Sequence, residues 1–180
     1  MEYDLIALFD HPVSLFEFIP AAIVTFGAGG TNRCEIDVVW RRAAGDQEFE
    51  GRLALRWDLD AIRVNTPQID RQLRSRLEHD DDQATRTEEA AVVVAVAVMA
   101  NVEPRMRITR RSMTWTRHDY YLNGSRDEMI EVAGRWEGGL PGLFDEKRAQ
   151  SDLNPKLRKR WVSVTIMRQQ PRNRTEGRHT

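Results

Sequence analysis

The chain contains a single cysteine, Cys34, among its 180 residues. One cysteine cannot form an internal disulfide or a cysteine-rich zinc cluster, and such sparing use is typical of a cytoplasmic protein. The longest apolar run, residues 90–100, is too short to cross a bilayer. The N-terminal residues MEYDLIALFD carry acids where a secretory signal carries basic residues. We therefore expect a cytoplasmic protein that has no membrane partner.

Several catalytic motifs are also missing. There is no Gly-X-Ser-X-Gly nucleophile elbow, and Cys34 has no histidine near it in the sequence, so covalent catalysis has no support. The glycine cluster Gly27–Gly30 lacks the Gly-Lys-Ser/Thr ending of a phosphate-binding loop, and we interpret it as a turn. The histidines lack the spacing of zinc ligands. What is present, 41% hydrophobic and 31% charged residues, is typical of a globular protein.

The net charge of −1 hides an asymmetry between the two halves of the chain. Residues 1–90 contain 18 acidic and 10 basic residues, whereas residues 91–180 contain 10 acidic and 17 basic residues. The basic half suits a polyanion, and we expect it to bind nucleic acid, most simply DNA. The acidic half is expected to contact a protein partner or a second copy of the chain. The alternative is that both halves are ordinary solvated surfaces.

Residues 1–83 are predicted to form an acidic, β-rich region with one helix. Apolar or alternating residues favour strands in three segments, residues 22–26, 35–40 and 49–57. The helix is expected to begin after Thr66 as N-cap, with Pro67 in its first turn, where a missing N–H costs nothing. The acidic run Glu78–Asp82 disfavours compact structure, so we predict a domain boundary there.

Residues 84–170 are predicted to form an α/β core. Thr87 is the expected N-cap of a helix whose body, Ala90–Met99, is apolar all round; its valines would also suit a buried strand. Asn123–Gly124 is a strong hairpin signal. The remaining elements are predicted to be strands at residues 105–112, 118–122 and 128–133, a helix at 143–151 and a strand at 161–167. Residues 171–180 are expected to be a basic, flexible tail.

Two acids, Asp119 and Glu131, fall on neighbouring predicted strands of the hairpin. Carboxylates that converge there supply the hard oxygen ligands that Mg²⁺ or Mn²⁺ prefers and leave positions for water and a phosphate oxygen. Glu88 or Glu89, at the start of the apolar helix, is a candidate for a further acid. The alternative is that these acids are ordinary charged residues close to turns.

The order of these elements resembles the PD-(D/E)XK nuclease superfamily, whose members share an αβββαβ core. The matching pieces are TEEAAVVVAVAVMA, HDYYL, MIEVAG, DEKRAQ and RWVSVTIM, which together with their connections span about half of the chain. The resemblance implies that Asp119 and Glu131 are catalytic metal ligands for Mg²⁺ or Mn²⁺ and that Glu88 or Glu89 assists. The superfamily's lysine is replaced by Ala133, so either another cation takes its place or the site is inactive. Some members recruit this lysine from the following helix, where Lys147 is available with Gln150 one turn later.

Basic residues flank two of the predicted strands of the core. If the two groups meet, they form a surface suited to a phosphate backbone, on which nearby aromatic residues such as Trp115 and Tyr121 stack on bases. These aromatics are equally compatible with a place in the core. The candidate nucleic-acid-binding residues are Arg105, Arg107, Arg110, Arg111, Lys156, Arg158, Lys159 and Arg160.

The sequence therefore predicts a β-rich N-terminal portion followed by a restriction-endonuclease-like α/β core. The expected function is a metal-dependent nucleic-acid phosphodiesterase that acts on DNA within a defence or repair assembly. The alternative is a non-catalytic adaptor subunit that keeps the nuclease fold and binds protein or nucleic acid; Ala133 is the feature that favours it.

Overall fold

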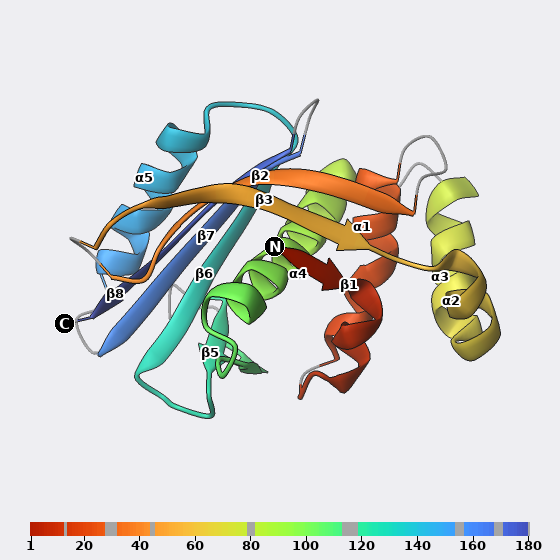
Figure 1. The fold of residues 1–180 in the computed structure, drawn as a ribbon, viewed down its shortest axis with the longest axis horizontal. Coiled ribbons are helices and arrows are strands. Elements are labelled where there is room, and N and C mark those ends of the chain that lie inside the picture. Colours follow the sequence, from red (N-terminus) through yellow and green to blue (C-terminus); the bar gives the residue numbers. More distant parts are fainter. Residues whose placement is uncertain are drawn as a thin grey trace.

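A computed structural model describes residues 1–12, 14–27, 32–43, 46–78, 82–112, 119–153, 157–167 and 171–179 (Figure 1). The described residues form a mixed α/β fold around one eight-stranded sheet. In chain order the elements are β1 (Glu2–Asp4), η1 (Leu5–Asp10), η2 (Leu15–Phe18), α1 (Ile19–Phe26), β2 (Arg33–Arg41), β3 (Phe49–Arg56), α2 (Leu59–Asn65), α3 (Pro67–Glu78), α4 (Gln83–Val102), β4 (Ile108–Arg111), β5 (Tyr120–Leu122), β6 (Glu128–Arg135), α5 (Leu140–Asp152), β7 (Lys159–Ile166) and β8 (Arg172–His179).

The strand order across the sheet is β1-β3-β2-β8-β7-β6-β5-β4. Strands β4, β5 and β6 form an antiparallel meander, and β6 is parallel to β7. Strand β8 lies antiparallel to β7 and parallel to β2, which pairs antiparallel with β3. The N-terminal strand β1 completes the edge by pairing parallel with β3. The sheet is therefore continuous from the N-terminal strands to the C-terminal ones.

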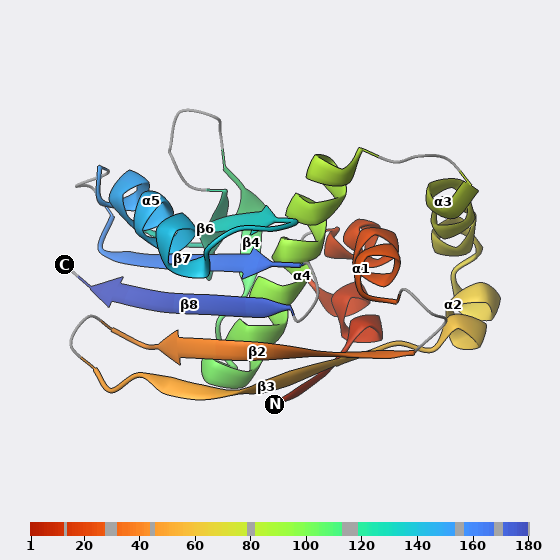
Figure 2. The same cartoon turned by 90° about the horizontal axis from the view of Figure 1, so that it is seen from above.

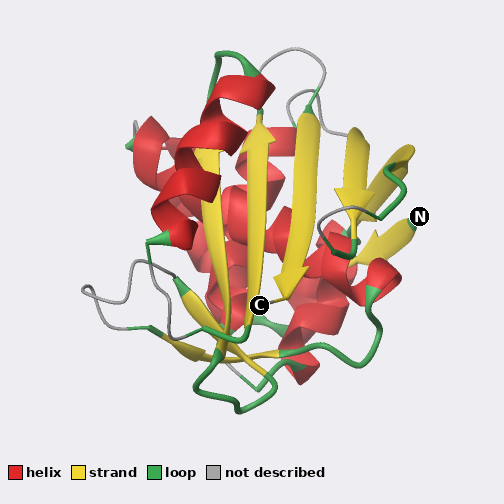
Figure 3. Ribbon diagram, turned by 90° about the vertical axis from the view of Figure 1, so that its left-hand side faces the viewer, coloured by secondary structure: helices red, strands yellow, loops and turns green. Residues whose placement is uncertain are grey.

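Helices cover the two faces of the sheet unequally. Helix α4 packs on β6 and on α1, and α1 packs on α3, so these helices form one layer. Helix α5 covers the opposite face, where it contacts β7, β8 and β6; Figure 3 shows it in front of the strands with the other helices behind. Helices α2 and α3 lie at the end of the molecule remote from α5 (Figures 1 and 2). None of the helices in the described part of the chain combines the length and apolarity needed to span a membrane.

The apolar segment Ala90–Met99 is helical, as predicted. Helix α4 begins four residues before the expected cap: Asp82 is the N-cap, and its carboxylate accepts hydrogen bonds from the Ala84 N–H at 3.1 Å and the Thr85 hydroxyl at 2.7 Å. Thr87 is instead buried inside the helix. The helix tolerates an apolar surface all round because the sheet covers one side and α1 the other.

The segment Ala22–Phe26, predicted to be a strand, belongs to helix α1. Its residues are almost all buried, between α4 and α3, so no polar face marks the helical period in the sequence. The described part of residues 1–82 therefore contains three α-helices, not one. The predicted strands at 35–40 and 49–57 correspond to β2 and β3, and the helix predicted after Thr66 is α3.

The expectation of a flexible tail at residues 171–180 is wrong for residues 172–179, which form β8 in the middle of the sheet. The Asn173 amide, fully buried, donates hydrogen bonds to the Val164 carbonyl at 2.9 Å and the Thr165 hydroxyl at 3.0 Å. Buried Glu176 pairs with Arg41 of β2. The buried side chains of β8 are polar and are satisfied by polar partners. The sequence of this strand therefore lacks the alternation of apolar and polar residues by which a strand is predicted.

The parts of the chain before and after the predicted domain boundary near residue 83 share one hydrophobic core. One apolar core contains Leu5, Ile36 and Leu53 from the N-terminal part together with Val94 and Trp161 from the C-terminal part. The acidic run itself lies largely outside the described residues, because residues 79–81 are not described. The two parts of the chain therefore pack as one unit.

Candidate active site

A cavity of about 370 Å³ lies where the N-terminal half of α4, the strands β5 and β6, and α5 approach one another. Its wall includes Glu88 of α4, Asp119 immediately before β5, and Lys147 of α5. Glu131, in the middle of β6, is only 2% exposed and contacts Lys147 from within the protein. The four residues predicted to be catalytic thus come from four separate elements and meet at one place.

The Asp119 side chain is held against the neighbouring strand. Its Oδ2 accepts a hydrogen bond from the Val132 N–H at 2.7 Å, and its own backbone N–H donates to the Ile130 carbonyl at 3.1 Å. Burial raises the pKa of the Asp119 carboxyl, although the Val132 hydrogen bond and the Lys147 charge oppose the rise. These contacts orient a partly buried carboxylate toward the cavity.

Glu131 is the most perturbed acid of the site. Burial raises the pKa of its carboxyl to about 7, and the nearby Asp119 charge adds to this rise. The Lys147 ammonium opposes it by donating a hydrogen bond to Glu131 Oε1 at 2.9 Å. The same ammonium donates to Gln150 Oε1 at 3.1 Å. Gln150 therefore helps to hold the Lys147 ammonium against the buried carboxylate of Glu131.

Ala133 follows Glu131 by two residues on β6, so the two side chains point to the same face of the strand. Ala133 lines the cavity, and the space that its small side chain leaves lies next to Lys147. Lys147 of α5, sixteen residues after Glu131 in the sequence, donates a hydrogen bond to the Glu131 carboxylate at 2.9 Å. The fold thus brings Lys147 into contact with Glu131 although the two residues are far apart in the sequence.

Gly134 lets α4 approach β6 closely. A Cβ at this position would overlap the Thr87 carbonyl oxygen and would lie 2.9 Å from the Ala91 Cβ. This approach brings the first turns of α4 to the cavity, where Glu88 is exposed. Glu89 also reaches the wall, but its carboxylate is paired with Arg76 at 2.7 Å. Of the two acids considered from the sequence, Glu88 is thus the one whose charge acts on the pKa of Asp119.

Asp119 and Glu131 fit a divalent cation by their chemistry. Both offer hard oxygen ligands, and their mutual repulsion is relieved when a cation binds between them. Glu131 Oε2 has no hydrogen-bond partner among the described residues, so one of its oxygens is free to coordinate. Within the same described part of the chain, no group of three or more His, Cys, Asp or Glu residues is arranged to hold a metal.

The basic residues before and on β4 divide between the two ends of that strand. Arg111 lines the cavity and its charge lowers the pKa of Asp119. Arg110 stacks on the Tyr121 ring, with 4.2 Å between the guanidinium carbon and the ring centroid. Arg107 lies at the opposite end of β4, and Arg105 is exposed in the preceding turn. Only Arg111 of this group accompanies the acids.

The basic residues just before and at the start of β7 have partners of their own. Arg158 pairs with Glu128 at 3.2 Å, and Arg160, 8% exposed, pairs with Asp152 at 3.8 Å. Lys159 lies over the Trp161 ring. Lys156 is outside the described residues, as is the predicted stacking candidate Trp115. The described part of the chain therefore does not gather the two basic groups into one patch beside the acids.

Sequence reasoning missed other residues of the cavity wall. Phe18 reaches it from the N-terminal region, more than one hundred residues from Asp119, and no local pattern indicates this contact. Arg135 also lines the cavity, and its guanidinium pairs with Glu146 at 2.7 Å. Comparison of the chain with protein-family models, curated proteins and solved structures gave no match.

Proposed function

We propose that this protein is a metal-dependent nucleic-acid phosphodiesterase with DNA as its expected substrate. The observation that carries the proposal is that Asp119 and Lys147 line one cavity and that Lys147 contacts the buried carboxylate of Glu131 behind its wall. A buried carboxylate with a pKa of about 7, a second carboxylate beside it and a fixed lysine are typical of a site arranged for chemistry.

The order and pairing of the elements support the same proposal. From α4 to β7 the chain forms a helix, three antiparallel strands, a helix and a strand that returns parallel to β6. This is the order expected for the αβββαβ core of the PD-(D/E)XK superfamily. Asp119 stands at the second strand of this order and Glu131 on the third, where that superfamily carries its acids.

In the proposed reaction Asp119 and Glu131 hold the cation, which when bound supplies a Lewis acid and a more acidic water. Lys147 lies beside Glu131 and is placed to stabilise negative charge that develops on the phosphate. Arg111 contributes a second positive charge on the cavity wall for the phosphate of the substrate. Glu88 is an accessory acid at the rim.

The first test is calorimetric titration of Mn²⁺ and Mg²⁺, followed by cleavage assays on labelled single-stranded and double-stranded DNA and RNA. Wild type is expected to bind Mn²⁺ saturably and to cleave, whereas Asp119→Asn with Glu131→Gln should do neither. Asp145→Asn is the matched control, because Asp145 is an exposed acid of α5 that does not line the cavity. Failure of wild type to bind either cation would refute the proposal.

The variant Lys147→Met tests the role of the lysine separately from the role of the metal ligands. Loss of one charge-stabilising donor typically lowers turnover about 10²–10³-fold, so cleavage should fall by that factor while Mn²⁺ binding persists. An equal rate in wild type and Lys147→Met would show that Lys147 has only a structural role. Lys147→Arg retains the positive charge and is the variant in which partial activity is expected.

The second candidate function is a non-catalytic adaptor with the same fold, and the observation in its favour is Ala133. In that case the Lys147–Glu131 pair acts as a structural ion pair and the acidic N-terminal half binds a protein partner or a second copy. Light scattering after size-exclusion chromatography tests this candidate. A ring or filament that binds no Mn²⁺ would favour it over the phosphodiesterase, and a monomer that binds Mn²⁺ would exclude it.

A further inference from the structure

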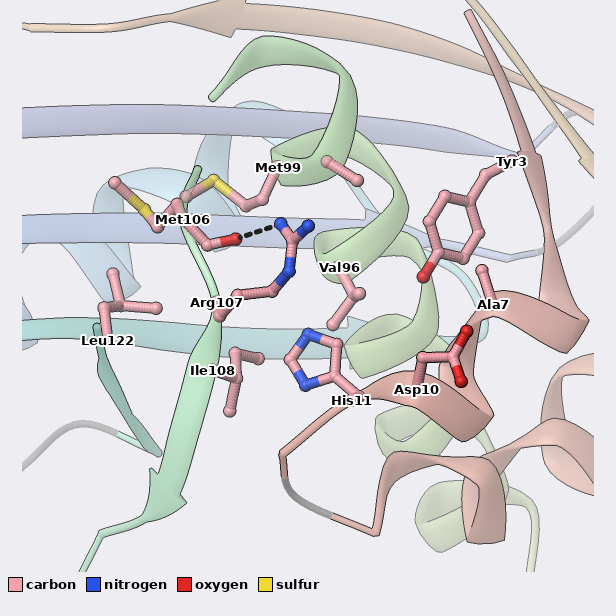
Figure 4. A pocket seen from close by; sticks show the side chains of 11 residues that line it. Tyr3, Ala7, Asp10, His11, Val96, Met99, Met106, Arg107, Ile108 and Leu122 are labelled. Carbon is pink, nitrogen blue, oxygen red and sulfur yellow. Dashed lines mark hydrogen bonds between the residues drawn. The ribbon is translucent and has the colours of Figure 1, made fainter. Parts of the chain in front are cut away.

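A second cavity, of about 250 Å³, lies between η1, the C-terminal half of α4 and the start of β4 (Figure 4). It shares no lining residue with the candidate active site. Its inner wall is apolar and is formed by the side chains of Val96, Met99, Met106, Ile108 and Leu122. Such a wall favours an apolar group of small size, because burying that group removes its surface from water.

Two opposite charges stand on different sides of this cavity. Arg107 lies on the β4 side and Asp10 on the η1 side, with the cavity between them (Figure 4). The Arg107 guanidinium is fixed through Nη1, which donates to the Pro104 carbonyl at 2.7 Å and to the Met106 carbonyl at 2.9 Å. Neither Arg107 nor Asp10 forms an ion pair with another described residue. Each charge is thus available to a ligand.

His11 and Tyr3 add uncharged polar groups to the same rim. The His11 Nδ1 atom is buried and has no hydrogen-bond partner among the described residues. Burial, together with the positive charge of Arg107, lowers the pKa of the His11 imidazole, so the ring is neutral near pH 7. Buried polar atoms are rarely left unsatisfied in folded proteins, and this one belongs to a ring that lines the cavity.

We propose that this cavity binds a small zwitterion with an apolar side chain, that is, a hydrophobic α-amino acid. Its carboxylate accepts hydrogen bonds from Arg107, and its ammonium group donates to the Asp10 carboxylate. Its side chain contacts the two methionines and Val96 on the apolar wall. This site is independent of the proposed phosphodiesterase activity.

The pair of charges decides between ligand classes. A simple carboxylate of the same size would satisfy Arg107 but would leave Asp10 facing the apolar part of the ligand. A neutral base of the same size would pair with neither charge. A zwitterion satisfies both sides at once.

Calorimetry with L-leucine and L-methionine tests the proposal on the full chain. We expect saturable binding of at least one of them, and binding at least about tenfold weaker for L-leucinamide and for 4-methylpentanoate, which lack the carboxylate and the amine respectively. Arg107→Met and Asp10→Asn should each weaken leucine binding by a similar factor. Arg105→Met is the matched control, because Arg105 is exposed two residues away and does not line the cavity.

Three results would overturn this proposal. They are no saturable binding of leucine or methionine up to millimolar concentration, equal binding of leucine and 4-methylpentanoate, and undiminished leucine binding by Arg107→Met. Thermal unfolding of each variant without ligand identifies any loss of fold, and Asp10→Asn retains the test if Arg107→Met does not fold, because Asp10 is exposed. None of these measurements depends on DNA cleavage. The amino-acid-binding proposal and the phosphodiesterase proposal can therefore be refuted independently.

Discussion

Replacing Glu131 by glutamine should change how the stability of the protein depends on pH. Glutamine keeps the size of the protonated acid and can still accept the Lys147 hydrogen bond, but it cannot ionise. In wild type the buried carboxyl has a pKa of about 7, against an ordinary value of 4.5. The native chain therefore retains a proton between about pH 4.5 and 7 that the unfolded chain has lost.

The sign and the size of the effect follow from this difference in proton affinity. Because the native state binds more protons in that range, the contribution of Glu131 to stability is complete below about pH 4.5 and is lost as the pH rises to about 7. Each tenfold change in proton affinity is worth about 1.4 kcal/mol, so the loss amounts to about 3 kcal/mol. The free energy of unfolding of Glu131→Gln, minus that of wild type, should rise by about this amount between pH 4.5 and 8.

Urea unfolding followed by circular dichroism at half-unit steps from pH 4.5 to 8.5 measures this difference. Glu50→Gln makes the same covalent change at an exposed position of β3 and is the control. A difference that stays constant across the range, or that rises no more than in the control, would refute the argument from burial. Asp119→Asn gives a second arm: removing the neighbouring charge should lower the pKa of Glu131 and reduce the loss of stability.

Three further predictions concern α4 and α5. Gly134→Ala should destabilise the protein by roughly 1–3 kcal/mol in urea unfolding, because the added methyl group overlaps the Thr87 carbonyl oxygen; an unchanged midpoint would contradict the close packing of α4 on β6. Gly142→Ala is its matched control within α5, has no atom within 4 Å of the new Cβ, and should stabilise by about 0.5–1 kcal/mol. Asp82→Ala should cost about 1 kcal/mol through loss of the α4 cap, measured by thermal unfolding, whereas Asp82→Asn should restore most of it.

Much of the candidate site could be anticipated from local patterns. The Asn123–Gly124 turn has the two positive φ angles, 54° and 70°, that a tight hairpin of this type requires, so the pairing of β5 with β6 followed from two residues. That pairing places Asp119 near Glu131. Lys147 was found through the resemblance of the element order, and its contact with Glu131 depends on α5 packing against β6 and β7.

Other parts could not be read from the chain because their signals are not local. Helix α1 lacks a polar face, since neighbours cover it on several sides, and an apolar run of that length is equally compatible with a strand. The second cavity combines η1, α4 and β4, so its charges, Asp10 and Arg107, are nearly one hundred residues apart and have no common motif. Of the predicted basic residues, Arg158 and Arg160 bind acids that only the folded chain brings near them.

The sequence by itself determined the features whose cause lies within a few residues: the hairpin of β5 and β6 and the two acids carried by that hairpin. It favoured a helix for Ala90–Met99 but left a buried strand open. Tertiary structure alone decided the place of β8 at the centre of the sheet, the reach of Lys147 to Glu131 and the existence of two separate cavities. The physical reason is that turns and helix caps are satisfied by neighbouring residues. A buried polar strand such as β8 is stable only when hydrogen-bond partners from distant segments, here Ser163 and Thr165 for Asn173, are already in place.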